Sequence, residues 1–226
     1  MRLYKSPGEG YLYAGTTDLV AKMDNEIWLL DWKTGKKPKP KIGYKEWGLQ
    51  TASYRNADGR PTRNGVIHLD KETGGFTFYD YSDTYEQDIV GFKLLAHFWH
   101  NRHPDKDGLP SSTTITGLLD KSGPLTHWAA NCACDFIIER IDESIPYKDT
   151  LGIIELARKN FRSVSQKAMN IGSMVHEAIE IYLKEGIEPP KNTRDEVLAG
   201  FVAFLEFAEE HTLEVLDIEK IVYGKE

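Results

Sequence analysis

Two aspartates and a lysine in Tyr11–Gly35 have the types and spacing that could hold a divalent metal and a water molecule. The segment reads YLYAGTTDLVAKMDNEIWLLDWKTG, and its Leu, Ile, Val, Trp and Thr residues predict two β-strands around a tight turn at Asp24–Asn25. With the turn centred there, Asp18 faces Asp31 across the hairpin, with their Cβ atoms about 5 Å apart. Lys33 follows Asp31 by two residues and points to the same face. Because facing carboxylates repel unless a cation lies between them, this trio predicts a site for a divalent metal and a polarised water.

An exposed strand often carries the pattern Asp-x-Lys without any function, so the surroundings matter. The strand before Asp31 is apolar on both faces, which are formed by Trp28, Leu30 and Trp32 and by Ile27 and Leu29. A strand of this kind is covered on both sides. We therefore expect Asp31 and Lys33 in a covered site rather than on an open surface. A three-residue bulged loop in place of the two-residue turn would shift the pairing and weaken this argument.

Length and composition limit the classes of protein that fit. The chain has 226 residues, of which 40% are hydrophobic and 11% aromatic, and this suits one globular domain with a sizeable core. Its net charge of −7 argues against a uniformly basic nucleic-acid-binding protein, although six lysines lie between Lys33 and Lys45. Such a run can follow a phosphate backbone, and it can equally be a solvated loop.

The cysteines and the hydropathy pattern exclude further classes. Cys132 and Cys134 alone cannot supply the four thiolates of an iron–sulfur cluster or of a Cys-only zinc site. The chain shows neither a charged-then-apolar leader nor an apolar run of about 18 residues. We therefore expect a soluble, cytoplasmic protein that does not partner a membrane.

The remaining pattern predicts mostly helices. Tyr44–Ala57 is expected to be a helix that carries Gln50 and Tyr54 on one face. The other expected elements are a hairpin of Gly65–Leu69 and Phe76–Tyr81, a helix capped by Asp83 and ending near Arg102, helices over Ser112–Leu119, Pro124–Arg140, Thr150–Phe161, Ser165–Lys184 and Arg194–Glu210, and a strand over Leu213–Tyr223. His103–Pro110 is the strongest linker signal. The nearby His97, His100 and His103 leave a zinc site conceivable, but their spacing fixes no fourth ligand.

The expected helix Ser165–Lys184 carries a second group of chemically capable residues. At 100° per residue its inward stripe contains Ala168, Ile171, Val175, Ile179 and Tyr182. Gly172, His176 and Glu180 lie on a neighbouring row, from which the last two can reach towards a site. Alternatively, His176 is a surface histidine paired with Glu180.

Together these segments resemble the motif set of the PD-(D/E)xK nuclease superfamily, within its RecB-like exonuclease branch, which includes phage and CRISPR-associated members. The motifs are GTTD (Gly15–Asp18), LLDWKTG (Leu29–Gly35), QTASY (Gln50–Tyr54) and GSMVHEAIE (Gly172–Glu180). In that family the histidine helix precedes the G-x-x-D strand, whereas here it follows. Reading from Glu226 into Met1 restores the usual order, so the chain resembles a circularly permuted member. The alternative is a swapped dimer in which two chains complete each other's site.

The resemblance implies an α/β fold, in which a central mixed sheet carries helices on both faces as in restriction endonucleases. Residues 1–226 would form one nuclease domain, with a catalytic half over 1–102 and a helical half over 111–226 joined by 103–110. The implied activity is metal-dependent hydrolysis of DNA, as an exonuclease. A structure-selective endonuclease and a non-catalytic DNA-binding module are the alternatives.

The resemblance also implies a role for each site residue. Asp18, Asp31, His176 and the Trp32 carbonyl would bind Mg²⁺ or Mn²⁺, and Lys33 would orient or deprotonate the attacking water. Gln50 and Tyr54 would contact DNA or support the site. Glu180 and Glu219 are weaker candidates, for supporting or second-metal roles.

Overall fold

The computed structural model describes residues 3–8, 10–35, 43–119, 122–141 and 145–225. The chain divides into two compact units. The sheet unit comprises Met1–Leu119 and Met174–Glu226, and the helical unit comprises Asp120–Ser173. This division differs from the expected one, in which two halves meet at 103–110. The end of that expected linker is part of the fold, because β6 (Leu109–Pro110) pairs with β1 (Leu3–Tyr4).

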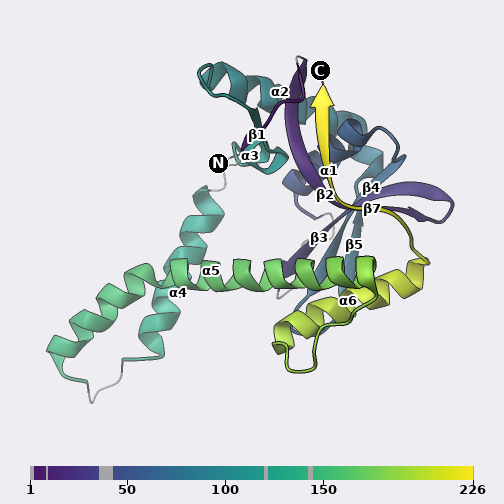
Figure 1. The fold of residues 1–226 in the computed structure, drawn as a ribbon. Helices are drawn as coiled ribbons and strands as arrows, with labels where there is room; N and C mark the ends of the chain where they lie inside the picture. Colours follow the sequence, from purple (N-terminus) through teal and green to yellow (C-terminus); the bar gives the residue numbers. More distant parts are fainter. Residues whose placement is uncertain (1–2, 9, 36–42, 120–121, 142–144, 226) are drawn as a thin grey trace. The chain divides into compact units, whose positions relative to one another are not determined.

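A five-stranded mixed sheet forms the centre of the sheet unit (Figure 1). Its order is β5-β4-β3-β2-β7, and only the β3–β4 pair is parallel. The bounds are β2 Tyr11–Met23, β3 Glu26–Gly35, β4 Arg63–Asp70, β5 Phe76–Asp80 and β7 Glu214–Lys225. The prediction of an α/β fold with a mixed sheet is confirmed.

The hairpin of β2 and β3 has the predicted two-residue turn. Asp24 and Asn25 both have positive φ, 52° and 64°, which is the backbone that tight hairpin turns require and that Asp and Asn tolerate. Met23 is therefore paired with Glu26, and the ladder continues in this register to Leu19 and Leu30. The bulged-loop alternative is excluded.

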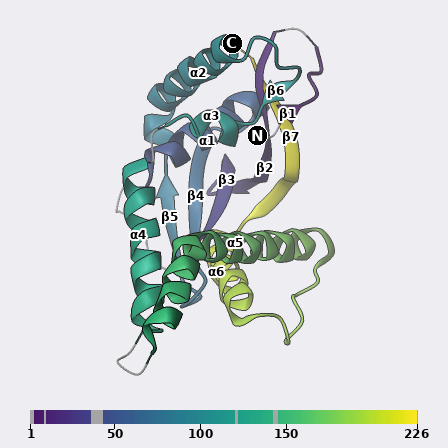
Figure 2. The same cartoon turned by 90° about the vertical axis from the view of Figure 1, so that its left-hand side faces the viewer.

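Helices cover both faces of the sheet (Figure 2). α1 (Lys45–Asp58) connects β3 to the parallel β4 and packs with α2 (Tyr85–Arg102) over one face. α6 (Asp195–His211) packs on the other face, against β4 and β5. Successive side chains of β3 point to opposite faces of the sheet. Asp31 contacts Gln50 of α1 on one face, and Trp32 contacts Phe204 of α6 on the other.

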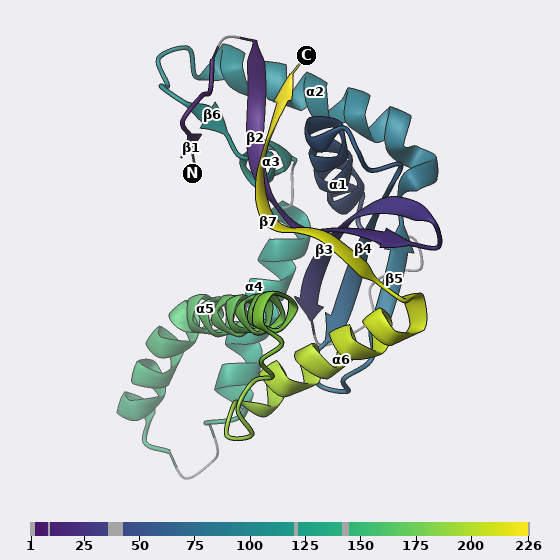
Figure 3. The same ribbon diagram turned by 45° about the vertical axis from the view of Figure 1, so that its right-hand side comes forward.

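The strand predicted over Leu213–Tyr223 is present as β7, at one edge of the sheet. β7 pairs antiparallel with β2 along nearly its whole length, so that Tyr11 lies opposite Lys225 (Figure 3). The end of β7 is thus beside the start of β2, as in two strands of a hairpin. A circularly permuted chain is expected to have Met1 and Glu226 close together, but both lie outside the described residues, so this stays a prediction.

Several helix predictions are corrected. Asp83 does not cap α2, because Ser82–Thr84 forms a 3₁₀ turn and Thr84 occupies the N-cap position. The segments predicted as two helices are one, α5 (Tyr147–Glu185), since no Gly or Pro interrupts Arg162–Ser165. Ala168 is exposed rather than inward.

α3 covers Ser112–Thr116 and α4 covers Ser122–Ile138.

The alternative of a zinc site at His97, His100 and His103 loses support, because His100 and His103 bond instead to the carbonyl oxygens of Leu12 and Trp99, at 2.7 and 2.8 Å. Lysines 36, 37, 39 and 41 lie outside the described residues. Over the described part of the chain, no helix has both the length and the apolar character that a membrane crossing requires.

Candidate metal centre

The site begins where β2 separates from β3. Among the described residues, the β2–β3 ladder ends at Leu19 and Leu30, whereas the β2–β7 ladder continues to Tyr11. Asp18 is the first residue beyond this fork and is 8% exposed. Its Oδ2 accepts a hydrogen bond of 3.0 Å from the backbone N–H of Trp32. The carboxylate thus holds the two strands together at the point where the ladder stops.

The sheet register aligns three carboxylate-bearing residues at one level of the sheet. Continuing the β2–β3 register places Asp18 opposite Asp31. The β2–β7 pairs on either side, Thr17 with Lys220 and Leu19 with Ile218, place Glu219 opposite Asp18 from the other edge. Such a row is electrostatically unfavourable unless positive charge offsets it.

Glu219 has an unusual backbone. Its φ is 51° in the middle of strand β7, a left-handed conformation that costs a residue other than Gly roughly 1–2 kcal/mol. Residues held in this way cluster at binding and catalytic sites, where the surrounding structure enforces the strain. Here the strain coincides with the position opposite Asp18.

Asp18, Glu219 and His176 form a group with metal-binding geometry. One ligand atom from each residue can be chosen so that all three lie within 4.8 Å of one another. His176 comes from the part of α5 that belongs to the sheet unit, and its Nδ1 lies 3.9 Å from Asp18 Oδ1. Its ring also meets the Trp32 indole edge-on, with the centroids 5.6 Å apart. Carboxylate oxygens and imidazole nitrogen are both ligands of divalent metals, so this group could hold a metal ion.

Asp31 belongs to an adjoining layer of polar contacts. Lys33 Nζ lies 2.7 Å from Asp31 Oδ2, which confirms that the two side chains share a face. Gln50 Nε2 donates to Asp31 Oδ1 at 3.3 Å and to the Tyr54 hydroxyl at 3.1 Å. Gln50 of α1 therefore links Asp31 to Tyr54. A Cβ on Gly15 would lie 2.2 Å from Tyr54 Cε1, so the small residue at position 15 makes room for the tyrosine.

Burial and neighbouring charge perturb the pKa values in this layer. Burial, and then the charge of Asp31, raise the pKa of Asp18 well above its usual value. Burial lowers the pKa of Lys33, but the charges of Asp31 and Asp18 outweigh it and the net pKa is raised. The lysine therefore stays charged at neutral pH.

The pKa of the His176 imidazole is shifted downward, in contrast to those of Asp18 and Lys33. Burial lowers the pKa of His176 to about 4, against the opposing charge of Asp31 and a backbone hydrogen bond with Trp32. His176 is therefore neutral at pH 7, which is the form that binds metals. A cation among these atoms would offset the buried charge of Asp18, so the donor set fits a divalent ion.

Three expected participants lie differently from what the sequence suggests. Asp31, expected as a metal ligand, is outside the group that could hold a metal and contacts Lys33 and Gln50 instead. Glu180 forms an ion pair with Lys184 one turn further along α5 and is outside the group that could hold a metal. Glu219, expected only as a weaker candidate, is inside it. The sequence signals the strand of Glu219 but not its left-handed φ, which depends on how β7 meets β2.

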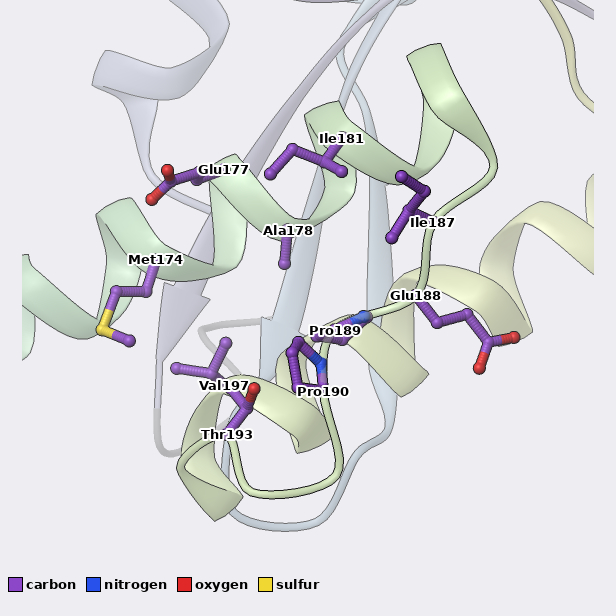
Figure 4. Close-up of a pocket in the computed structure, with 10 residues that line it drawn as sticks. All are labelled: Met174, Glu177, Ala178, Ile181, Ile187, Glu188, Pro189, Pro190, Thr193 and Val197. Carbon is purple, nitrogen blue, oxygen red and sulfur yellow. The ribbon is translucent and has the colours of Figure 1, made fainter.

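A separate apolar groove lies between the end of α5 and the start of α6 (Figure 4). It encloses about 200 Å³, and Met174, Ile181 and Ile187 contribute to its lining. None of the residues of the metal-binding group lines it. The groove is therefore separate from the group that could hold a metal.

No protein-family model matches this chain, and comparison with curated proteins and with solved structures finds no match. Its function therefore has to be argued from the site.

Proposed function

We propose that this protein is a metal-dependent nuclease that hydrolyses DNA phosphodiester bonds. The observation that carries the proposal is the grouping of Asp18, His176 and Glu219 ligand atoms within 4.8 Å, beside the pair of Lys33 and Asp31. A group that could hold a metal, next to a half-buried lysine, suits phosphoryl transfer, which needs positive charge where the transition state is negative. The resemblance of the four motifs to RecB-like nucleases points to the same chemistry.

Asp18, His176 and Glu219 would hold the cation, with Asp31 and the Trp32 carbonyl close by. Bound there, a divalent ion supplies a Lewis acid for the phosphoryl oxygen and lowers the pKa of water. The imidazole ligand favours Mn²⁺ over Mg²⁺ alone.

Lys33 would orient the attacking water and stabilise the charge that develops on the phosphate. Its ion pair with Asp31 supports this positioning role. Because the aspartates keep the ammonium protonated, orientation and charge stabilisation are better supported than deprotonation of the water. Gln50 and Tyr54 would hold Asp31 in place, as their hydrogen bonds suggest.

The group assembles within one chain, and this favours a circularly permuted monomer over a swapped dimer. His176 and Asp18 approach to 3.9 Å without a second copy. Lys225 at the end of β7 is paired with Tyr11 at the start of β2, so a short direct connection there would restore the family's order. The permutation therefore requires no rearrangement of the site.

Incubation of the protein with end-labelled linear DNA and with closed circular DNA tests the proposal. We expect cleavage with Mn²⁺ and none with EDTA, and as an exonuclease the protein should degrade only the linear substrate. Cleavage of the closed circle would instead identify the endonuclease alternative. If neither substrate is cut with Mn²⁺ or Mg²⁺, the proposal is wrong and a non-catalytic module is the better reading.

A further inference from the structure

The helical unit carries its own surface features. It consists of α4 and the first part of α5, which are tied together by a hydrogen bond of 2.9 Å from Asn160 Nδ2 to the Cys132 carbonyl. Several large side chains of this unit are exposed, among them Trp128 at 38% and Met169 at 63%. Singly exposed apolar side chains are ordinary, whereas a contiguous apolar surface marks an interaction site.

Trp128 borders a hollow of about 360 Å³ between the two helices. Phe161 and Met169 add apolar surface to its lining, and Arg162, Ser165 and Gln166 add hydrogen-bonding groups. A nucleobase has the matching character, since its faces are apolar and its edges carry donors and acceptors. Aromatic side chains beside an arginine are the usual stacking partners of unpaired bases.

A row of positive charge continues from this hollow along α5. Arg158, Lys159 and Arg162 line a neighbouring hollow together with a single carboxylate, Glu155. Arg162 belongs to both hollows. Arg158 and Arg162 are four residues apart, which places them on one side of the helix and about 6 Å apart along its axis. In a chain with a net charge of −7, this local excess of cations suits an anionic partner.

We infer that the helical unit binds single-stranded DNA, with one unpaired base in the Trp128 hollow and the adjoining phosphates on Arg158, Lys159 and Arg162. This inference rests on the proposed function, for which it names a second contact with the substrate. A second copy of the chain fits the surface less well, because a symmetric contact would bring the same cations together. A duplex fits less well too, because its paired bases are not available for stacking.

Binding of a fluorescent single-stranded oligonucleotide, followed by anisotropy in EDTA, tests the inference without cleavage. Trp128→Ala should weaken binding about 10-fold, in line with the loss of one stacked base, whereas Trp128→Phe should retain most of the affinity. A duplex of the same sequence should bind the wild-type protein more weakly than the single strand.

Charge is tested separately from stacking. Arg158→Ala and Arg162→Ala should each lower the slope of log K against log salt concentration by about 0.7, as expected for one lost contact to a single-strand phosphate. Lys167→Ala is the matched control, because Lys167 is an exposed cation on the same helix that lies about 180° around from Arg158. Circular dichroism of each variant verifies that the helices are retained.

Each outcome decides between the two claims. Cleavage of DNA by the wild type, combined with unchanged binding by the Trp128 and arginine variants, overturns this inference and leaves the nuclease proposal standing. Binding that depends on Trp128 and Arg162 without any cleavage in Mn²⁺ supports the inference and contradicts the nuclease. Duplex binding as tight as single-strand binding, or no binding at all, also overturns the inference.

Discussion

The imidazole Nδ1 of His176 lies 3.9 Å from Asp18 Oδ1, although the two residues come from distant parts of the chain. The first is on the last third of α5 and the second is in the middle of β2. Their approach, together with Glu219, creates the one group of metal-binding geometry found among the described residues.

Mn²⁺ should raise the melting temperature of the protein. A ligand that binds only the folded state at about 100 times its dissociation constant adds about 2.7 kcal/mol of stability. Asp18→Asn should be more stable than the wild type without metal, because burial and Asp31 both oppose the charge of Asp18, and it should respond less to Mn²⁺. Thermal melts with and without Mn²⁺ measure both effects.

His176→Ala should also reduce the response to Mn²⁺, and more than the response to Mg²⁺, which prefers oxygen ligands. His97→Ala is the matched control, since His97 is an exposed histidine on α2. A His176→Ala protein that is stabilised by Mn²⁺ as strongly as the control would remove His176 from the ligand set.

The left-handed backbone of Glu219 predicts an unusual ranking of substitutions. With φ at 51°, Glu219→Gly should be about 1 kcal/mol more stable than Glu219→Ala, the reverse of the order in an ordinary strand. Both should lose part of the response to Mn²⁺. Urea unfolding without metal measures the ranking, and a more stable alanine variant would mean that the backbone relaxes at this position.

Gly15 and Tyr54 should behave as a coupled pair. Because a Cβ on Gly15 would come 2.2 Å from Tyr54 Cε1, Gly15→Ala should cost about 1–3 kcal/mol through overpacking. The same change in a Tyr54→Ala background should cost much less. Gly75→Ala is a control, since a Cβ there meets no atom closer than 3.6 Å. Additive effects of the two changes in denaturant unfolding would contradict the packing argument.

Asp58 should make stability depend on pH in the acidic range. Arg60 contacts its carboxylate at 2.7 and 2.9 Å, and Lys220 of β7 contacts it at 2.8 Å. Burial raises the pKa of Asp58, but these hydrogen bonds outweigh it and lower the pKa to about 2. Since the folded pKa is below the unfolded one, this stabilisation is present above the unfolded value of about 4 and is lost as the pH falls towards 2.

Asp58→Asn should therefore lower the free energy of unfolding at pH 6 by about 1 kcal/mol, after allowance for solvent screening. The difference in unfolding free energy between the variant and the wild type should shrink as the pH falls from 6 towards 2. Denaturant unfolding at several pH values measures it. Asp107→Asn, which alters an exposed aspartate in the turn after α2, is the control. A difference that stays constant from pH 6 to pH 3 would show that the ion pairs contribute nothing.

Local sequence patterns predicted the hairpin and the sharing of one face by Asp31 and Lys33. They did so because a two-residue turn fixes the register and side chains alternate along a strand. The meeting of His176 with Asp18 could be anticipated only through resemblance to a family, since nothing local links a helix to a distant strand.

What the sequence could not supply depends on contacts between elements. The left-handed backbone of Glu219, which β-propensity does not encode, could not be predicted from the sequence. Glu180 pairs with Lys184 rather than with His176. Both partners are four residues from Glu180 on the same helix, so spacing alone could not decide between them. The boundary at Asp120 was missed because the signal at His103–Pro110 looks like a linker, while Leu109 is buried.

The single-turnover rate of linear DNA cleavage at saturating Mn²⁺, compared between the wild type and Lys33→Met, is the most direct test of the proposed nuclease chemistry. The wild type should cleave, and the variant should be slower by at least about 100-fold, as for the loss of one electrostatic stabiliser of a transition state. Thermal melts of Lys33→Met should still respond to Mn²⁺, because Lys33 is not a metal ligand. Equal cleavage rates would contradict the proposed role of Lys33, and no cleavage by the wild type would contradict the proposed nuclease activity.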